Sequence, residues 1–277
     1  MRCKVLLTVT TYPLPSKSYD ELVCTAGLLE NGDWIRIYPV PLGLLMDLKT
    51  RKFKANLKYT WVELELERRT KDFRPESHSP KHKDFSDMKV LDHLDTAGHW
   101  SARKEICLKK VYTSMAQLLE DSKPPKSVSL AAYKPKRIID FVIEASDEDW
   151  DPMYKELRKQ TDLFAPEDRV EPKELIRKIP WKFSYRFEDE TGKVRKLMIE
   201  DWEIGALYWK CMATSGGNEQ EALRLVRMKY EEEFLNKCEI TLFLGTTLEF
   251  HAKIAPNPFL IIGVFYPRRR DQMKLEF

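Results

Sequence analysis

The sequence predicts a mixed α+β protein: a β-rich N-terminal lobe, built as a partly open barrel or sheet, followed by a C-terminal lobe of the order ββααββ. Segments of the first half alternate apolar and polar residues with the two-residue period of strands. The second half places two helically spaced segments between apolar, strand-like runs. Of the 277 residues, 43% are hydrophobic, so there is ample apolar side chain for folded cores.

Four strands are expected first, at residues 4–10, 22–29, 34–40 and 61–68. The Asn31-Gly32-Asp33 sequence predicts a hairpin between the second and third, with a tight primed turn, because Asn-Gly supplies positive φ angles. In the fourth strand Val62, Leu64 and Leu66 alternate with glutamates. This alternation predicts one face in the core and the other in solvent.

The next segment, residues 70–100, is polar and holds four of the five histidines, which favours a long loop or flap. A strand at 105–112, a short helix at 114–120 and an apolar strand at 137–144 are expected to follow. These elements complete the first lobe, which we expect to span residues 1–145.

Composition changes to Asp, Glu, Lys and Pro between residues 146 and 179, which predicts a helical and polar connection with amphipathic stretches at 153–163 and 172–179. The second domain is expected over residues 180–277. Its predicted elements are a hairpin formed by 181–188 and 194–199, helices at 202–213 and 218–235, and buried strands at 238–244 and 259–265.

Positive charge is concentrated in the first half of the chain. Residues 1–140 carry 25 Lys and Arg against 18 Asp and Glu, whereas residues 141–277 carry 22 against 26. The balances are +7 and −4, although the whole chain has a net charge of only +3. This asymmetry predicts a polyanionic partner for the first lobe.

Cations near aromatic rings give this hypothesis its candidate residues, because phosphates require long cations and bases stack on rings. The predicted nucleic-acid-binding residues are Arg36, Tyr38, Arg51, Lys52, Lys54, Arg74, Arg103, Lys136 and Arg137. The partner is expected to be DNA or RNA, and the sequence does not separate the two. A solvated surface is the competing explanation for each of these cations.

Four short basic clusters support the hypothesis if they share a face: Arg103-Lys104, Lys109-Lys110, Lys134-Pro135-Lys136-Arg137 and Arg268-Arg269-Arg270. Three of them on one face would attract a polyanion. Their spacing in the sequence does not show whether they converge.

Clustered acids offer an enzymatic alternative, a nuclease dependent on Mg²⁺ or Mn²⁺. Asp201 and Glu203 are its candidate catalytic residues, because carboxylates at a strand end can hold a divalent metal. The competing explanation is structural: Asp201 is a natural helix N-cap and Glu203 complements the helix dipole. The sequence therefore leaves open whether the chain is an enzyme, and no cofactor is expected under the main hypothesis.

A third hypothesis is a subunit that binds another protein through Trp202, Tyr208 and Trp209; a helix core would explain the same rings. Five scattered cysteines without a C-x-x-C pair indicate reduced thiols, as in the cytoplasm, rather than disulfides or a zinc site. No stretch approaches the length of a membrane span, so no membrane partner is expected.

Overall fold

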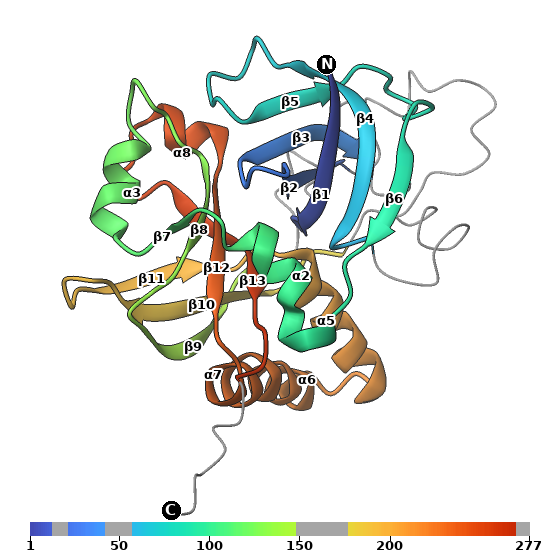
Figure 1. The fold of residues 1–277 in the computed structure, drawn as a ribbon. Helices are drawn as coiled ribbons and strands as arrows, with labels where there is room; N and C mark the ends of the chain where they lie inside the picture. The colour runs from blue at the N-terminus through green and yellow to red at the C-terminus, as the bar shows by residue number, and fades with distance from the viewer. Residues whose placement is uncertain (13–21, 42–56, 148–176, 270–277) are drawn as a thin grey trace, which may run out of the picture.

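The computed structural model describes residues 1–12, 22–41, 57–147 and 177–269 (Figure 1). It is a mixed α+β fold, as predicted, with a barrel in the N-terminal part and two sheets with helices in the C-terminal part. The amphipathic stretch at 153–163 lies outside the described residues, as does most of the stretch at 172–179.

Five strands close the N-terminal barrel in the order β1-β2-β3-β5-β4, because β4 also pairs with β1. The strands are β1 (Arg2–Thr10), β2 (Leu22–Leu28), β3 (Trp34–Pro41), β4 (Thr60–Arg68) and β5 (Ser77–Pro80). A further strand, β6 (Lys89–His93), pairs with β4 on the outside of this ring. The segment at residues 70–100, where the sequence predicts a long loop, thus contains the two short strands β5 and β6. Their polar composition is not typical of strands, so the sequence did not predict them.

Apolar side chains, which alternate with polar ones along the strands, fill the barrel, as the sequence predicts for β4. Val62, Leu64 and Leu66 are buried together with Val5 and Ile35 from neighbouring strands. Residues on the opposite face of β1 are buried as well, because the barrel packs there against the C-terminal part. Barrel and C-terminal part therefore share an apolar interface.

The predicted hairpin is present, but its turn differs from the predicted type. The amide of Gly32 donates to the carbonyl of Leu29 at 2.9 Å, and the amide of Leu29 donates to Asp33 at 2.9 Å. Only Gly32 has a positive φ, of 83°. The connection is therefore a three-residue loop with glycine in the left-handed position, rather than a two-residue primed turn that needs positive φ at both residues.

Two sheets form the C-terminal part (Figure 1). The first has the order β13 (Phe259–Phe265), β12 (Thr241–Thr246), β8 (Leu130–Tyr133) and β7 (Val111–Tyr112). The second has the order β11 (Val194–Met198), β10 (Trp181–Glu188) and β9 (Arg137–Ala145). Because β9 pairs with β10 from Arg137 to Ala145, this sheet joins strands that the sequence divided between two domains.

Helices surround these sheets. They are α2 (Ala97–Cys107), α3 (Met115–Asp121), α5 (Trp202–Thr214), α6 (Glu219–Arg227), the π-helix η1 (Met228–Glu233), α7 (Phe234–Lys237) and α8 (Leu248–Ala252). The predicted helices at 114–120, 202–213 and 218–235 are confirmed. The strand predicted at 105–112 is wrong for most of its length, since Glu105 to Cys107 end helix α2, which buries Arg103 and Cys107 one helical turn apart.

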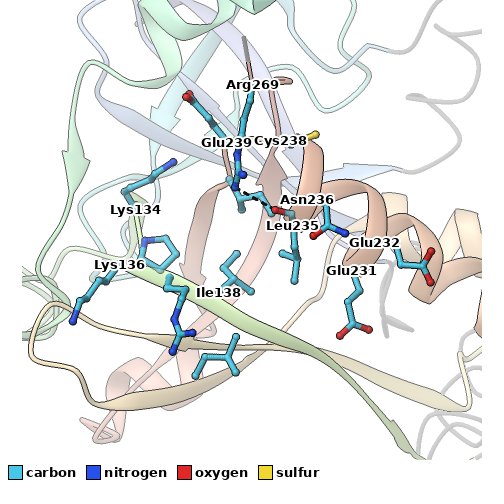
Figure 2. A pocket seen from close by; sticks show the side chains of 14 residues that line it. Lys134, Lys136, Ile138, Glu231, Glu232, Leu235, Asn236, Cys238, Glu239 and Arg269 are labelled. Atoms are coloured by element: carbon cyan, nitrogen blue, oxygen red, sulfur yellow. Dashed lines mark hydrogen bonds between the residues drawn. The ribbon is translucent and has the colours of Figure 1, made fainter. Parts of the chain in front are cut away.

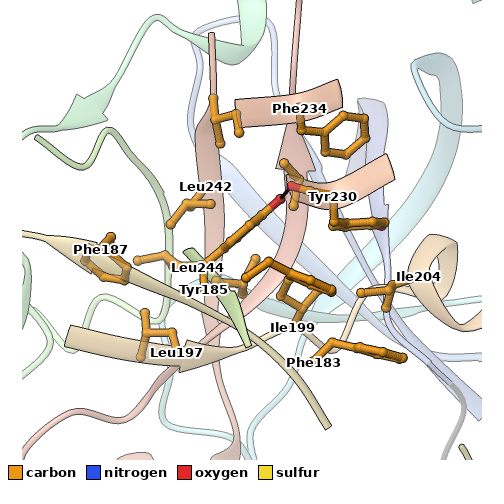
Figure 3. Close-up of a cluster of buried hydrophobic side chains, with 14 of the residues drawn as sticks. Phe183, Tyr185, Phe187, Leu197, Ile199, Ile204, Tyr230, Phe234, Leu242 and Leu244 are labelled. Carbon is orange, nitrogen blue, oxygen red and sulfur yellow. Dashed lines mark hydrogen bonds between the residues drawn. The ribbon is translucent and has the colours of Figure 1, made fainter. Parts of the chain in front are cut away.

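Aromatic side chains dominate the core of the C-terminal part. Phe183, Tyr185 and Phe187 project from β10 towards β12 and the helices (Figure 3). The hydroxyl of Tyr185 donates to the backbone carbonyl of Tyr230 in η1 at 2.6 Å. This bond satisfies a buried hydroxyl and fixes η1 against the sheet that carries β9.

Candidate functional site

Arg36 is a structural residue in the interior. Only 3% of it is exposed, and its guanidinium donates to the hydroxyls of Ser77 at 3.1 Å and Ser129 at 2.8 Å. Ser129 precedes β8, so the contact joins the barrel to the C-terminal sheet. Desolvation lowers the pKa of Arg36, as expected for a buried cation.

Arg74 makes a second buried connection between the two parts. Its guanidinium forms a bidentate pair with Asp72, at 2.9 and 2.6 Å, and donates to the backbone carbonyl of Thr246 at 2.7 Å. Glu76, which the sequence places beside it, instead accepts hydrogen bonds from Ser129. The guanidinium of Arg74 thus donates its hydrogen bonds to acceptors within the protein.

Arg103 lies against aromatic rings. Its guanidinium is 4.1 Å from the ring centre of Tyr59 and 4.8 Å from that of Trp100, and it donates to the carbonyl of Leu94 at 2.8 Å. The expectation that Arg36, Arg74 and Arg103 face a phosphate backbone does not fit their burial, because a phosphate contact requires an accessible cation. Sequence alone did not show that these three long side chains point inward.

The other predicted residues divide into three groups. Tyr38 is partly buried under the guanidinium of Arg69, 4.9 Å from its ring centre. Arg51, Lys52 and Lys54 lie outside the described residues. Lys136 and Arg137 are exposed, and they line the pocket described below.

The acidic pair forms a buried ion cluster with a lysine of the barrel. Asp201 caps α5 by accepting from the amide of Glu203 at 3.1 Å, which confirms the predicted cap. Lys58 lies 2.5 Å from Glu203 Oε2 and 3.7 Å from Asp201 Oδ2. Desolvation raises the pKa of Asp201 to about 7, against the opposing effect of Lys58.

This donor set is unsuited to a divalent metal. The ammonium of Lys58 already supplies the positive charge beside both carboxylates, and Mg²⁺ requires a larger set of oxygen ligands. Across residues 1–12, 22–41, 57–147 and 177–269, no three His, Cys, Asp or Glu side chains are grouped to hold a metal ion. The cluster therefore connects barrel and α5, and it carries no argument for a nuclease.

Aromatic residues of α5 also serve the interface within the chain. Trp202 stacks on Tyr12 with ring centres 5.7 Å apart, and the indole of Trp209 donates to the Tyr12 hydroxyl at 3.0 Å. Tyr208 is buried. These contacts give the three rings a role in the fold of this chain.

Two of the four basic clusters line one pocket of about 520 Å³ between β9 and the helices η1 and α7, and Lys104 of a third cluster lies beside one of its lining residues. Lys134, Lys136 and Arg137 form one wall, whereas Arg269, from beyond β13, donates to the backbone carbonyl of Leu235 in α7 at 3.2 Å (Figure 2). Lys104 of α2 lies 3.9 Å from Glu239, which also lines the pocket. The folded chain thus brings together cations that are more than 160 residues apart in sequence.

Burial and the neighbouring cations both lower the pKa of Lys134. Desolvation lowers this pKa most, Glu239 raises it, and the charges of Arg269 and Lys104 lower it further. Lys136 and Arg137 share one partner, Glu188, at 3.2 Å each. More positive than negative charge is therefore held on this wall, as required for binding an anion.

The opposite wall is acidic and polar. Glu231 and Glu232 belong to η1, and Asn236 to α7 (Figure 2). A π-helical segment is rare and is often found at a functional site, because the extra residue in the turn redirects side chains. Glu231 is paired with Arg227 at 2.6 Å, and Arg227 also donates to Phe141 of β9.

Sequence reasoning found Lys136 and Arg137 but did not select the rest of this site. Lys104, Lys134 and Arg269 belong to the basic clusters noted in the sequence, so composition did contain their signal. Glu231, Glu232 and Asn236 follow an ordinary helical pattern, which gave no signal at all.

Two family models divide the chain between them. Residues 1–109 match a domain of unknown function (DUF8758). Residues 111–276, more than half of the chain, match another domain of unknown function (DUF8757). The chain belongs to the DUF8757 family. The junction between the DUF8758 and DUF8757 matches lies between α2 and β7, where strand pairing passes from the barrel to the C-terminal sheets.

Other comparisons add little to the family assignment. No curated protein matches the chain. A solved structure of a murine DNA-binding protein bound to double-stranded DNA is 9% identical, with a TM-score of 0.32 over 97% of this chain and 95% of that one. Likeness at this level carries no argument about fold or function. In the part of the chain that is described, no helix is both long and apolar enough to cross a bilayer.

Proposed function

We propose that this chain binds nucleic acid, with the basic wall of the pocket between β9 and α7 contacting the phosphate backbone. The observation that carries the proposal is that cations from two distant chain segments, represented by Lys136 and Arg269, line this one pocket, with Lys104 of a third segment beside its Glu239. Clustered and accessible cations attract a polyanion, whereas scattered or buried ones do not.

Accessibility separates these cations from the buried arginines. The side chains of Lys136 and Arg137 are 56% and 68% exposed, and both share the single carboxylate of Glu188. A phosphate can therefore replace or join Glu188 without disturbing the core. Sequence-independent contacts of this kind account for most non-specific binding of proteins to nucleic acid.

The test is a salt titration of the full chain with labelled single-stranded and duplex DNA and RNA. Binding is expected to weaken steeply between roughly 50 and 200 mM salt, through release of counterions. The double variant Lys136→Ala, Arg137→Ala is expected to weaken binding and to reduce the slope of log K against log salt by about 2, one unit for each lost phosphate contact.

The chain offers a matched control in the fourth basic cluster, which lies apart from the pocket. Lys109 and Lys110 are also adjacent and exposed, and Lys110 pairs with Asp33 at 2.6 Å. The variant Lys109→Ala, Lys110→Ala removes the same net charge and is expected to retain the wild-type slope. Equal losses in both variants would show that total charge, rather than the pocket, governs binding, and absence of binding at low salt would refute the function.

A further inference from the structure

The pocket between β9 and α7 has two walls of opposite character, and a phosphate backbone explains only one of them. Figure 2 shows Lys134 and Lys136 on the side of β9, with Glu231 and Glu232 on the helical side. Carboxylates accept hydrogen bonds but cannot donate them, so they would repel phosphate oxygens. The acidic wall therefore fits a different part of the ligand.

Apolar side chains lie between the walls. Ile138 and Ile139 of β9, Leu235 of α7 and Ile240 contribute aliphatic surface to the pocket lining. A flat, weakly polar ring can pack on such a surface, while its edge remains available for hydrogen bonds. The volume of about 520 Å³ is in the range of pockets that enclose small organic ligands.

Asn236 completes the polar lining. Its amide carries both a donor and an acceptor, and it lies one helical turn beyond Glu232. An amide beside a carboxylate suits a ligand edge with an amino group next to an acceptor atom. Cytosine has such an edge, with the amino group at position 4 next to a ring nitrogen that accepts.

We propose that this pocket holds one unstacked nucleotide of a single strand, with its phosphate on the basic wall and an amino-bearing base, cytosine in particular, directed at Glu232 and Asn236. The inference rests on the proposed function and names its ligand more closely. A base inside a duplex is stacked and cannot enter a pocket, so single strands are bound in preference to duplexes.

Uracil supplies the matched probe. It has the same ring as cytosine, but at position 4 it bears an oxygen in place of the amino group and its N3 carries a hydrogen, so the donor and the acceptor of this edge are exchanged. Labelled oligo(dC) and oligo(dU) of equal length are titrated with the full chain at neutral pH and constant salt. The expected result is about tenfold tighter binding of oligo(dC), within the discrimination that one base-specific contact provides.

The variants Glu232→Gln and Asn236→Ala test which residues make the distinction. Glu232→Gln keeps the shape and adds a donor, so the ratio of the two affinities is expected to fall close to one. Removing a negative charge strengthens binding of every oligonucleotide, which is why the ratio, rather than either affinity, is the measurement. Glu249→Gln, at an exposed side chain of α8, is the control and is expected to keep the wild-type ratio.

The results test the nucleotide pocket separately from the binding of nucleic acid in general. Binding with a ratio of one in the wild type would overturn the nucleotide pocket while leaving backbone binding intact, as would duplex bound as tightly as single strand. A preference for oligo(dC) that survives Glu232→Gln and Asn236→Ala, in variants with unchanged thermal midpoints, would also overturn it. Absence of binding to every probe would refute the proposed function itself.

Discussion

Two regions of this protein hold the same kinds of cation in opposite environments. At the interface between the barrel and the C-terminal part, Arg36 and Lys58 are largely withdrawn from solvent and directed at protein oxygens. At the pocket beside β9, Lys136 and Arg137 are exposed and share one glutamate. The first set connects two parts of the fold, and the second remains accessible to an anion.

Arg103 and Lys104 show the difference between neighbours in the sequence. Arg103 lies over the rings of Tyr59 and Trp100, whereas Lys104 extends towards Glu239 at the pocket. In the sequence these two residues form one basic cluster. Their roles separate because successive residues of a helix point in directions about 100° apart, here towards the core and towards the pocket.

The largest expected effect is loss of the buried ion cluster. Lys58→Met leaves the carboxylates of Asp201 and Glu203 without their cation, and breaking a buried pair in this way costs about 3–5 kcal/mol. Urea unfolding at about pH 8, above the pKa of Asp201, measures the change in the free energy of unfolding. Lys81→Met, which breaks an exposed pair with Glu65, is the control, and equal effects would contradict the comparison.

Substitution of a buried arginine is expected to change stability, and substitution of an exposed one is expected to change nucleic-acid binding. Arg36→Met removes charged hydrogen bonds to Ser77 and Ser129, and it is expected to cost about 2–3 kcal/mol of stability without changing nucleic-acid affinity. Arg137→Met is expected to weaken binding and to leave the thermal midpoint unchanged. Unfolding curves and salt titrations on both variants check the pattern, which fails if Arg36→Met alters the salt slope.

The two hairpins allow a comparison of the barrel with the C-terminal part. Gly32 and Gly192 both have positive φ, at 83° and 86°, so valine is strained at either position. An added Cβ at Gly32 would lie 2.7 Å from Lys109 Cβ, whereas at Gly192 it meets only the flexible Glu188 carboxylate at 3.5 Å.

Gly32→Val is therefore expected to destabilise the protein by about 1–3 kcal/mol, and Gly192→Val by less. Thermal unfolding of both variants measures the difference. An equal or larger loss in Gly192→Val would show that backbone strain, rather than the contact with Lys109, dominates at both turns.

The last expected effect depends on pH. Burial raises the pKa of Asp201 from 3.8 to about 7, so the folded state binds a proton that the unfolded state has released. The stability that this proton on Asp201 contributes is fully present below about pH 4 and is lost as the pH rises through about 7. Asp201→Asn keeps the cap and removes this titration, since Asn and Asp cap comparably.

Unfolding free energies of the wild type and Asp201→Asn between about pH 4 and pH 8 check this expectation. The two proteins are expected to differ by less than about 1 kcal/mol at pH 4, where Asp201 is protonated, and to diverge as the pH rises. Glu200, whose pKa burial also raises, is present in both and cancels. Parallel curves would show that Asp201 does not titrate in this range.

The sequence by itself determined the elements whose causes are local. The alternation of Val62, Leu64 and Leu66 fixed a strand and its buried face, Gly32 fixed a hairpin, and Asp201 fixed the start of α5. Each depends on residues within a few positions of one another, so a pattern in the chain is enough to predict it. The polar segment that contains β5 and β6 lacked such a pattern, and its strands are held by partners elsewhere in the barrel.

Only the tertiary structure decided which charged residues form the site. Arg36 and Arg137 are alike in the sequence, and the fold buries one against Ser129 and exposes the other at the pocket. The acidic wall from Glu231 to Asn236 faces β9 because η1 is fixed to β10 through Tyr185 and Tyr230. These side chains are brought together by pairing and packing between distant segments, which no local pattern of residues specifies.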